Sequence, residues 1–194
     1  MDERESELRA LLGETGAYRE GHFEIAPEQH VLSYFHCERL FQYPALASRA
    51  ADLLFDALEG VDATFVFAPS ISALPLGFEL ARRTTWQFAV HARPFTLTTY
   101  RFPPRTRVLV VEDVVVSGRS LRHAHAWCLE RGADVAGYAV LVDRRPEGGN
   151  DFDGLRLWAG LHDPVRTFSP ERCPACRDRV PLEFVDPNYP ERLG

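Results

Sequence analysis

The fold of this chain is decided by residues 107–121, which read RVLVVEDVVVSGRSL. The four aliphatic residues 108–111 are typical of a strand that is buried on both faces of a sheet. Two acids follow at the carboxyl end of this strand, and a loop of small residues then leads into apolar residues at helical spacing, which end at Gly132. The stretch therefore predicts a strand, an acidic pair, a loop and a helix start in direct succession.

This succession of elements suits an anionic ligand that carries hydroxyl groups. Backbone N–H groups of a small-residue turn and of a helix start bind phosphate. Ser117 and Ser120 add hydroxyl donors, and Gly118 lets the backbone approach a ligand closely. Glu112 and Asp113 supply acceptors for sugar hydroxyls or for a magnesium-bound ligand. The pattern indicates a ribose 5-phosphate site; the alternative is an ordinary strand-to-helix turn with a chance acidic pair.

Residues 108–120 resemble the motif with which type I phosphoribosyltransferases bind 5-phosphoribosyl 1-pyrophosphate (PRPP). In that motif four apolar residues precede two acids, three variable residues, a Ser or Thr, a Gly, a variable residue and a Ser or Thr, and the chain matches every fixed position. Many members have a second Gly where Arg119 stands. The resemblance implies that Glu112 and Asp113 orient the ribose, while the 5-phosphate is clamped by Val116, Ser117, Gly118, Arg119 and Ser120.

Composition and charge narrow the class of protein. With 194 residues, 45% hydrophobic and 26% charged, the chain has the composition of an ordinary globular protein, and its net charge of −6 gives no reason to expect nucleic-acid binding. The amino-terminal residues are acidic and polar, with no secretory signal visible, and no apolar run approaches the ~18 residues that span a bilayer. We therefore expect a cytoplasmic location.

All 22 basic residues are arginines. Coding bias in a G+C-rich genome is the simplest explanation for this composition. The absence of lysine nevertheless excludes every mechanism that needs a lysine ammonium group from this chain.

Strands and helices alternate along the middle of the chain, which predicts a parallel α/β sheet with its ligand at the carboxyl ends of the strands. We expect helices at 2–12, 44–59 and 75–83, strands at 63–68, 86–90, 135–142 and 155–161, and an exposed turn at 146–150. The family resemblance implies a central parallel sheet flanked by helices, with a small hood from the N-terminal segment. It divides the chain into a hood and base-side segment (1–43), an α/β core (44–161) and a C-terminal tail (162–194).

The segments 15–25 and 33–37 resemble the amino-terminal region of orotate phosphoribosyltransferases, where a Gly-His-Phe strand leads to a Tyr-Phe strand. This resemblance places Phe23 and Tyr34 on the base side of the site. The family usually has Ser-Gly where Ala26 and Pro27 stand, and a basic residue near Cys37. Plain hydrophobic packing of the aromatic side chains is the alternative.

Two further segments correspond to the family's pyrophosphate contacts. The loop Pro69, Ser70, Ile71 and Ser72 follows a predicted strand, but of the usual glycines only Gly77 remains nearby, so the site is weakened. Residues 91–102 match a mobile loop that carries lysines and arginines in the family. Here its strong cations are Arg93 and Arg101, which the resemblance makes catalytic together with Asp113; the alternative is that both arginines are merely solvated.

The tail contains a Cys-x-x-Cys pair, Cys173 and Cys176. A closed zinc site needs four ligands, and the sequence shows no second pair, since Cys37 and Cys128 are isolated and His162 adds at most a third ligand. A redox dithiol and a structural tail remain open beside zinc, so no protein side chain is assigned to a metal. A similar Ser-Pro-Glu-x-Cys-Pro-x-Cys tail occurs in one orotate phosphoribosyltransferase subgroup.

The resemblance implies an enzyme that transfers the phosphoribosyl group of PRPP to a nucleobase, with orotate and pyrimidine biosynthesis as the expected case. It also implies substrate-bound Mg²⁺ and a homodimer. The missing loop lysines support a second hypothesis, a protein of the same fold that binds PRPP or a nucleotide as a sensor or regulator without efficient turnover. The sequence leaves the accepted base open.

Overall fold

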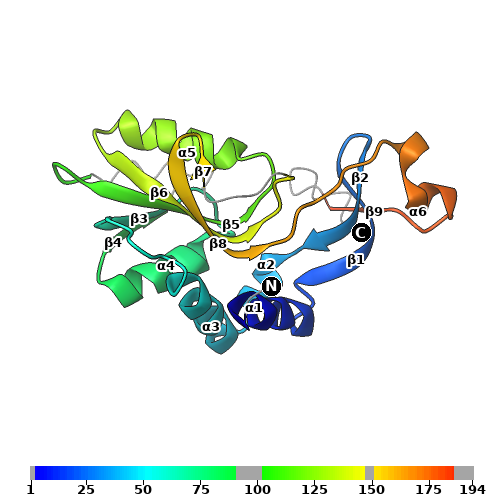
Figure 1. Ribbon diagram of the computed structural model, residues 1–194, viewed down its shortest axis with the longest axis horizontal. Helices are drawn as coiled ribbons and strands as arrows, with labels where there is room; N and C mark the ends of the chain where they lie inside the picture. Colours follow the sequence, from blue (N-terminus) through cyan, green and yellow to red (C-terminus); the bar gives the residue numbers. More distant parts are fainter. Residues whose placement is uncertain (1–2, 91–101, 147–150, 186–194) are drawn as a thin grey trace.

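The computed structural model describes residues 3–90, 102–146 and 151–185 (Figure 1). Its helices are α1 (Glu3–Glu14), α2 (Cys37–Phe41), α3 (Pro44–Phe55), α4 (Leu74–Thr84), α5 (Arg119–Leu129), the 3-10 turn η1 (Pro170–Arg172) and α6 (Pro174–Arg177). Its strands are β1 (Tyr18–Ala26), β2 (Gln29–Phe35), β3 (Phe65–Ala68), β4 (Gln87–Val90), β5 (Arg107–Val115), β6 (Asp134–Asp143), β7 (Asp151–Phe152), β8 (Leu155–His162) and β9 (Glu183–Phe184).

The larger sheet has six strands in the order β4-β3-β5-β6-β8-β7, all parallel except the short edge strand β7. Helix α5 covers one face, and α1, α3 and α4 cover the other (Figure 1). The predicted α/β fold, a central parallel sheet flanked by helices, is therefore confirmed. In the described part of the chain, no helix is long and apolar enough to cross a membrane.

Strand β5 lies at the centre of this sheet and is buried on both faces. Val108 and Val110 pack with α5, whereas Leu109 and Val111 pack in the cluster formed by α1, α3 and α4. All four side chains are fully buried. Each contributes about 1.5–3 kcal/mol to stability by leaving water. The aliphatic run thus has the two-sided burial that its composition predicts.

Several element boundaries differ from the sequence prediction. Strand β5 continues to Val115, because Val114 and Val115 pair with β6, so the two acids lie inside the strand rather than after it. Helix α3 ends at Phe55 instead of residue 59, because the N–H groups of Ala57 and Leu58 bond to carbonyls three residues back and tighten the chain into a turn. Strand β3 begins at Phe65, and β7 is too short to show an alternating pattern.

Two of the expected segments cannot be compared with the structure. The turn at 146–150 lies almost entirely outside the described residues, and so does the arm at 91–102.

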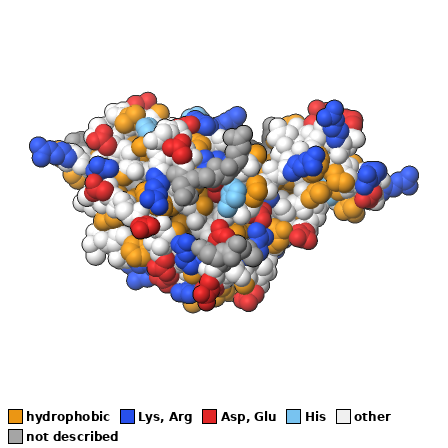
Figure 2. All heavy atoms as spheres, in the orientation of Figure 1, with side chains coloured by type: hydrophobic (Ala, Val, Ile, Leu, Met, Phe, Trp, Pro, Cys, Tyr) orange, Lys and Arg blue, Asp and Glu red, His pale blue; other side chains and the backbone are white. Residues whose placement is uncertain are grey.

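The second sheet is small and has the order β2-β1-β9. The β1–β2 hairpin is antiparallel, and β9 from the tail adds to β1 in parallel. We call this sheet, together with the tail segment 165–185, the hood. It projects from the larger body in Figures 1 and 2, and acidic and basic side chains are interspersed over the face shown in Figure 2.

A buried arginine connects the hood to the core. Arg144 is 4% exposed, and its guanidinium donates to the Ser33 carbonyl at 2.9 Å and to the Ser33 hydroxyl at 2.7 Å. It also pairs with Asp163, at 3.3 Å. The backbone N–H of Arg144 donates to the Val115 carbonyl at the end of β5, at 2.8 Å. One residue therefore contacts both the hood and the end of the central strand.

Candidate functional site

The loop after β3 and the end of strand β5 meet at the carboxyl edge of the large sheet. The loop after β3 carries Ser70 and Ser72, and strand β5 beside it carries the acids. The Ser70 hydroxyl donates to Glu112 at 2.9 Å, and the Ser72 hydroxyl donates to Asp113 at 3.2 Å. The two serine oxygens lie 3.1 Å apart. Because β3 and β5 are adjacent and parallel, two sequence segments with separately predicted roles form one polar cluster.

The acidic pair is buried enough to change its titration. Glu112 is 4% exposed and also accepts a hydrogen bond from the Ser120 hydroxyl. Burial, followed by the charge of Asp113, raises the pKa of Glu112 to about 7, against the opposing hydrogen bonds from Ser120 and Ser70. Burial also raises the pKa of Asp113 above its usual range. Two neighbouring buried carboxyls repel each other when both are ionised, so a cation or further hydrogen-bond donors would favour the doubly ionised pair.

The predicted phosphate loop begins directly after β5. Gly118 has a φ of +72° and caps α5. A Cβ atom there would lie 2.2 Å from Cζ of the buried Phe152 ring, so both the backbone conformation and the space require glycine. The loop residues Val116, Ser117, Arg119 and Ser120 are exposed, and together with Gly118 they line a pocket. The loop is thus open to a ligand on one side and packed on Phe152 on the other.

Arg122 stabilises the phosphate loop, a role that the sequence analysis did not predict. Its guanidinium donates to the Ser117 carbonyl at 2.9 Å and forms a two-contact ion pair with Asp153, at 2.7 and 3.3 Å. The same group lies over the Phe152 ring, 4.8 Å from its centroid. The only signal in the sequence is a basic residue one helical turn after Gly118, which is common on exposed helices.

The other residues of the predicted pyrophosphate loop lie around the polar cluster. Pro69 is half-buried and Ile71 is 62% exposed. Gly77 is not part of this loop: it lies inside α4, where an added Cβ would stand 2.9 Å from the Phe88 ring. Its small size permits close packing of α4 on the sheet, within the helix expected at 75–83. Arg93 and Arg101 lie outside the described residues.

The predicted base-side residues lie in the hood. Phe23 is 1% exposed and packs with Val31, Val165 and Val185. Tyr34 is partly buried, its ring centroid is 6.0 Å from that of Phe23, and its hydroxyl donates to the Val185 carbonyl at 3.3 Å. The Phe23 ring therefore forms the interior of the hood.

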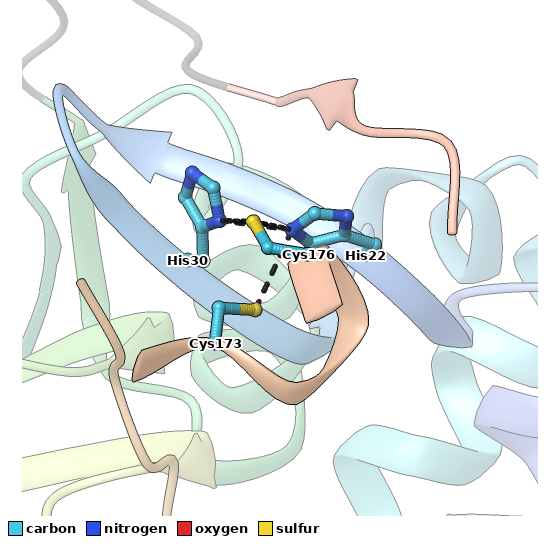
Figure 3. A group of neighbouring side chains, drawn as sticks. All are labelled: His22, His30, Cys173 and Cys176. Carbon is cyan, nitrogen blue, oxygen red and sulfur yellow. Dashed lines mark hydrogen bonds between the residues drawn. The ribbon is translucent and has the colours of Figure 1, made fainter. Parts of the chain in front are cut away.

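A second cluster contains four possible metal ligands. His22, His30, Cys173 and Cys176 place one ligand atom each within 4.8 Å of the others (Figure 3). The interpretation that the chain offers no second ligand pair for the cysteines is therefore wrong. The histidines lie on the two strands of the hairpin, about 150 residues from the tail, and nothing in their spacing points to the cysteines.

No family model matches the chain. A curated orotate phosphoribosyltransferase from Caldicellulosiruptor bescii is 31% identical over 176 residues, covering 89% of this chain and 92% of that protein. The orotate phosphoribosyltransferase of Pelotomaculum thermopropionicum is 32% identical over 179 residues, covering 90% and 93%. Among solved structures, the orotate phosphoribosyltransferase of Aeropyrum pernix superimposes with a TM-score of 0.68 and 26% identity, covering 80% of this chain and 93% of that chain.

Proposed function

The chain belongs to the orotate phosphoribosyltransferase family, and from this premise we propose that it transfers the 5-phosphoribosyl group of PRPP to orotate in pyrimidine nucleotide synthesis. In this reaction a ring nitrogen of orotate loses its proton to solvent and bonds to C1 of the ribose, and the C1–O bond to pyrophosphate breaks with its electron pair leaving on pyrophosphate. The observation that carries the proposal is the polar cluster of Ser70, Ser72, Glu112 and Asp113 beside the phosphate loop.

In the proposed complex, the loop from Val116 to Ser120 binds the 5-phosphate. Its small residues and the first turn of α5 present backbone N–H groups, and the helix start adds a favourable dipole. The exposed residues Ser117 and Arg119 complete the donor set, and the Ser120 hydroxyl, which donates to Glu112, connects the phosphate loop to the acidic pair. Since Arg122 and Phe152 fix the loop from behind, little reorganisation accompanies binding.

Glu112 and Asp113 accept the ribose hydroxyls in this proposal. Hydroxyl donors favour the ionised carboxylates, so ligand binding releases the proton that burial retains in the free protein. The surrounding donor set is all oxygen, from two carboxyls and two serines, which fits Mg²⁺. Magnesium, held mainly by the oxygens of PRPP, supplies positive charge against the departing pyrophosphate.

The loop after β3 contacts the pyrophosphate in this proposal. The family usually has a glycine-rich loop here, and in this chain the hydroxyls of Ser70 and Ser72 take the place of its donors. Arg93 and Arg101 are proposed as the cations that stabilise the leaving group, because the chain has no lysine. The hood, with Tyr34 at its partly buried surface, is proposed to cover the base. We propose a division of the chain into an N-terminal segment (1–43), a core (44–161) and a C-terminal tail (162–194), with the hood built from parts of the first and last segments.

A spectrophotometric assay tests the proposal. Purified protein with Mg²⁺, PRPP and orotate should lose orotate absorbance as orotidine 5′-phosphate forms, and omission of PRPP should abolish the change. The absence of lysine favours one other candidate, a PRPP or nucleotide sensor of the same fold. Calorimetric binding of PRPP without consumption of orotate or any other nucleobase would reject the enzyme and support the sensor.

Two further properties follow from the proposed activity. PRPP is a highly charged metabolite made and used inside cells, which supports a cytoplasmic location. The family builds its sites near a subunit interface, and we propose a homodimer on that basis. Light scattering should give twice the chain mass of 22.0 kDa, and a monomer at assay concentrations would contradict the dimer.

A further inference from the structure

We propose that His22, His30, Cys173 and Cys176 form a structural zinc site that ties the C-terminal tail to the β1–β2 hairpin. The four side chains come from three segments of the chain, and all point into one space (Figure 3). His22, His30 and Cys173 are at most 4% exposed, and Cys176 is half-buried. The site lies in the hood, outside the polar cluster and the phosphate loop.

The distances between the ligand atoms fit a tetrahedral ion. Nε2 of His22 lies 3.5 Å from Sγ of Cys173 and 3.6 Å from Sγ of Cys176. Nδ1 of His30 lies 3.3 Å from Sγ of Cys176 and 2.8 Å from Nε2 of His22. Zinc bonds of about 2.0 Å to nitrogen and 2.3 Å to sulfur place tetrahedral ligands roughly 3.3–3.8 Å apart. The two histidines need to separate by a few tenths of an ångström, and the other two pairs, His30 with Cys173 and Cys173 with Cys176, lie within 4.8 Å and need to approach by at most about 1 Å.

The hydrogen bond behind His22 prepares its ring for metal binding. Nδ1 of His22 lies 2.9 Å from the Val180 carbonyl oxygen, which can only accept, so Nδ1 carries the proton. Nε2 is then the unprotonated nitrogen and directs its lone pair toward the two sulfurs and His30. A backbone carbonyl behind a ligating histidine is the usual arrangement that fixes its tautomer in metal sites.

The ligand set selects zinc over the other biological cations. Two imidazoles and two thiolates in tetrahedral arrangement suit Zn²⁺, whereas Mg²⁺ and Ca²⁺ prefer oxygen ligands. A redox dithiol requires only the two cysteines and leaves the paired inward-facing histidines unexplained. All four ligands are protein side chains, so no open position remains for substrate, and the role is structural.

A zinc ion bound by these four residues would stabilise the hood. Among the described residues, the apolar cluster there has four buried members, Phe23, Val31, Val165 and Val185, with the partly buried Ile25 and Tyr34 packed against them. The tail is also held by the His30–Phe168 backbone bridge, by the short pairing of β9 with β1, by the Arg19–Glu183 ion pair and by the hydrogen bond from Tyr34 to the Val185 carbonyl. A small lobe with so little apolar burial commonly depends on a metal or a disulfide for its stability.

Metal analysis of the purified protein tests the proposal. Wild-type protein prepared without chelator should contain about one zinc ion per chain, as measured by inductively coupled plasma mass spectrometry. Cys173→Ala should lose the metal, whereas Cys128→Ala, which removes an equally buried thiol outside the cluster, should retain it. Wild-type protein that contains no zinc and takes up none from micromolar Zn²⁺ would overturn the proposal, as would full retention by Cys173→Ala.

A second measurement on the wild-type chain does not depend on whether the variant folds. Removal of zinc by a chelator and addition of Co²⁺ should give the thiolate-to-metal bands and intense visible absorption of a tetrahedral cobalt site with sulfur ligands. The chelated protein should also show a lower midpoint of thermal unfolding, restored by Zn²⁺. A Cys173–Cys176 disulfide in freshly purified metal-free protein, detected by thiol titration in denaturant, would reject the zinc site in favour of a redox pair.

Discussion

The Ser70 hydroxyl donates a hydrogen bond of 2.9 Å to the Glu112 carboxylate, across 42 residues of sequence. Each residue belongs to a segment with its own expected role, one facing pyrophosphate and the other facing ribose. Their contact means that the loop after β3 and the acids on β5 form a single preorganised cluster. A change at either residue therefore affects both halves of the proposed PRPP site.

The Asp113→Asn variant should bind PRPP more weakly. The substitution removes one acceptor charge from the proposed ribose contact and should raise the dissociation constant for PRPP with Mg²⁺ about 10- to 100-fold, or about 1.4–3 kcal/mol. Titration calorimetry measures this directly. The matched control is Asp134→Asn, an exposed acid at the start of β6, which should bind normally. An unchanged affinity in Asp113→Asn would remove its proposed role.

The Glu112→Gln variant should be more stable than wild type at pH 8 but not at pH 4. Because burial raises the pKa of Glu112 to about 7, the folded state keeps a proton that the unfolded chain loses near pH 4.5. The stabilising contribution of Glu112 is therefore fully present below pH 4.5 and is lost as the pH rises toward 7. Above pH 7 the ionised Glu112 destabilises the folded state. Gln should remove up to about 3 kcal/mol of that cost in urea unfolding.

Glu79→Gln is the contrasting control for this prediction. Although burial works in the opposite direction, hydrogen bonds from Arg82 and Arg83 lower the pKa of Glu79 to about 2. Its stabilising contribution is present above pH 4.5 and is lost only as the pH falls toward 2, so Gln should destabilise the protein at pH 8. The same sign for both variants at pH 8 would refute the explanation from burial.

The Gly118→Ala variant should disrupt the phosphate loop. A methyl group there meets both a positive φ and the Phe152 ring, so the loop must shift away from its binding conformation. We expect at least a tenfold loss of PRPP affinity and about 1–3 kcal/mol of stability. Gly132→Ala separates the two causes, since Gly132 has a φ of +76° and no neighbour within 4 Å of an added Cβ. Equal loss of stability in both variants would contradict a specific role for the Phe152 contact.

Arg122→Ala should loosen the same loop without removing any proposed ligand contact. Loss of the bond to the Ser117 carbonyl and of the pair with Asp153 should raise KM for PRPP severalfold and leave KM for orotate nearly unchanged. Arg131→Ala, just beyond the other end of α5, is the control and should behave as wild type. Steady-state kinetics with each substrate varied in turn distinguishes a specific support of the loop, which changes KM for PRPP, from a general loss of folded protein, which would lower the apparent kcat and leave both KM values unchanged.

The sequence predicted the arrangement of residues that are close together in the chain. It did not predict contacts between distant segments, because these depend on the order of strands in the sheet and on how the tail docks. The strand, acids and phosphate loop of residues 108–120 lie within one continuous motif, so their spacing alone predicts their arrangement. The Ser70–Glu112 contact requires β3 to lie beside β5, which no spacing encodes. The His22–Cys173 approach requires a tail to dock on a hairpin about 150 residues away, and two-residue strands such as β7 are too short to produce a periodic signal.

Arg144 connects the two ends of the proposed nucleotide site. Its side chain donates hydrogen bonds to Ser33 in the hood, and its backbone N–H donates to the Val115 carbonyl at the end of β5. A shift of the hood therefore pulls on the last residues before the phosphate loop. Occupancy at the sugar-phosphate end should in turn stiffen the hood, so that a ligand bound at either end should strengthen binding at the other.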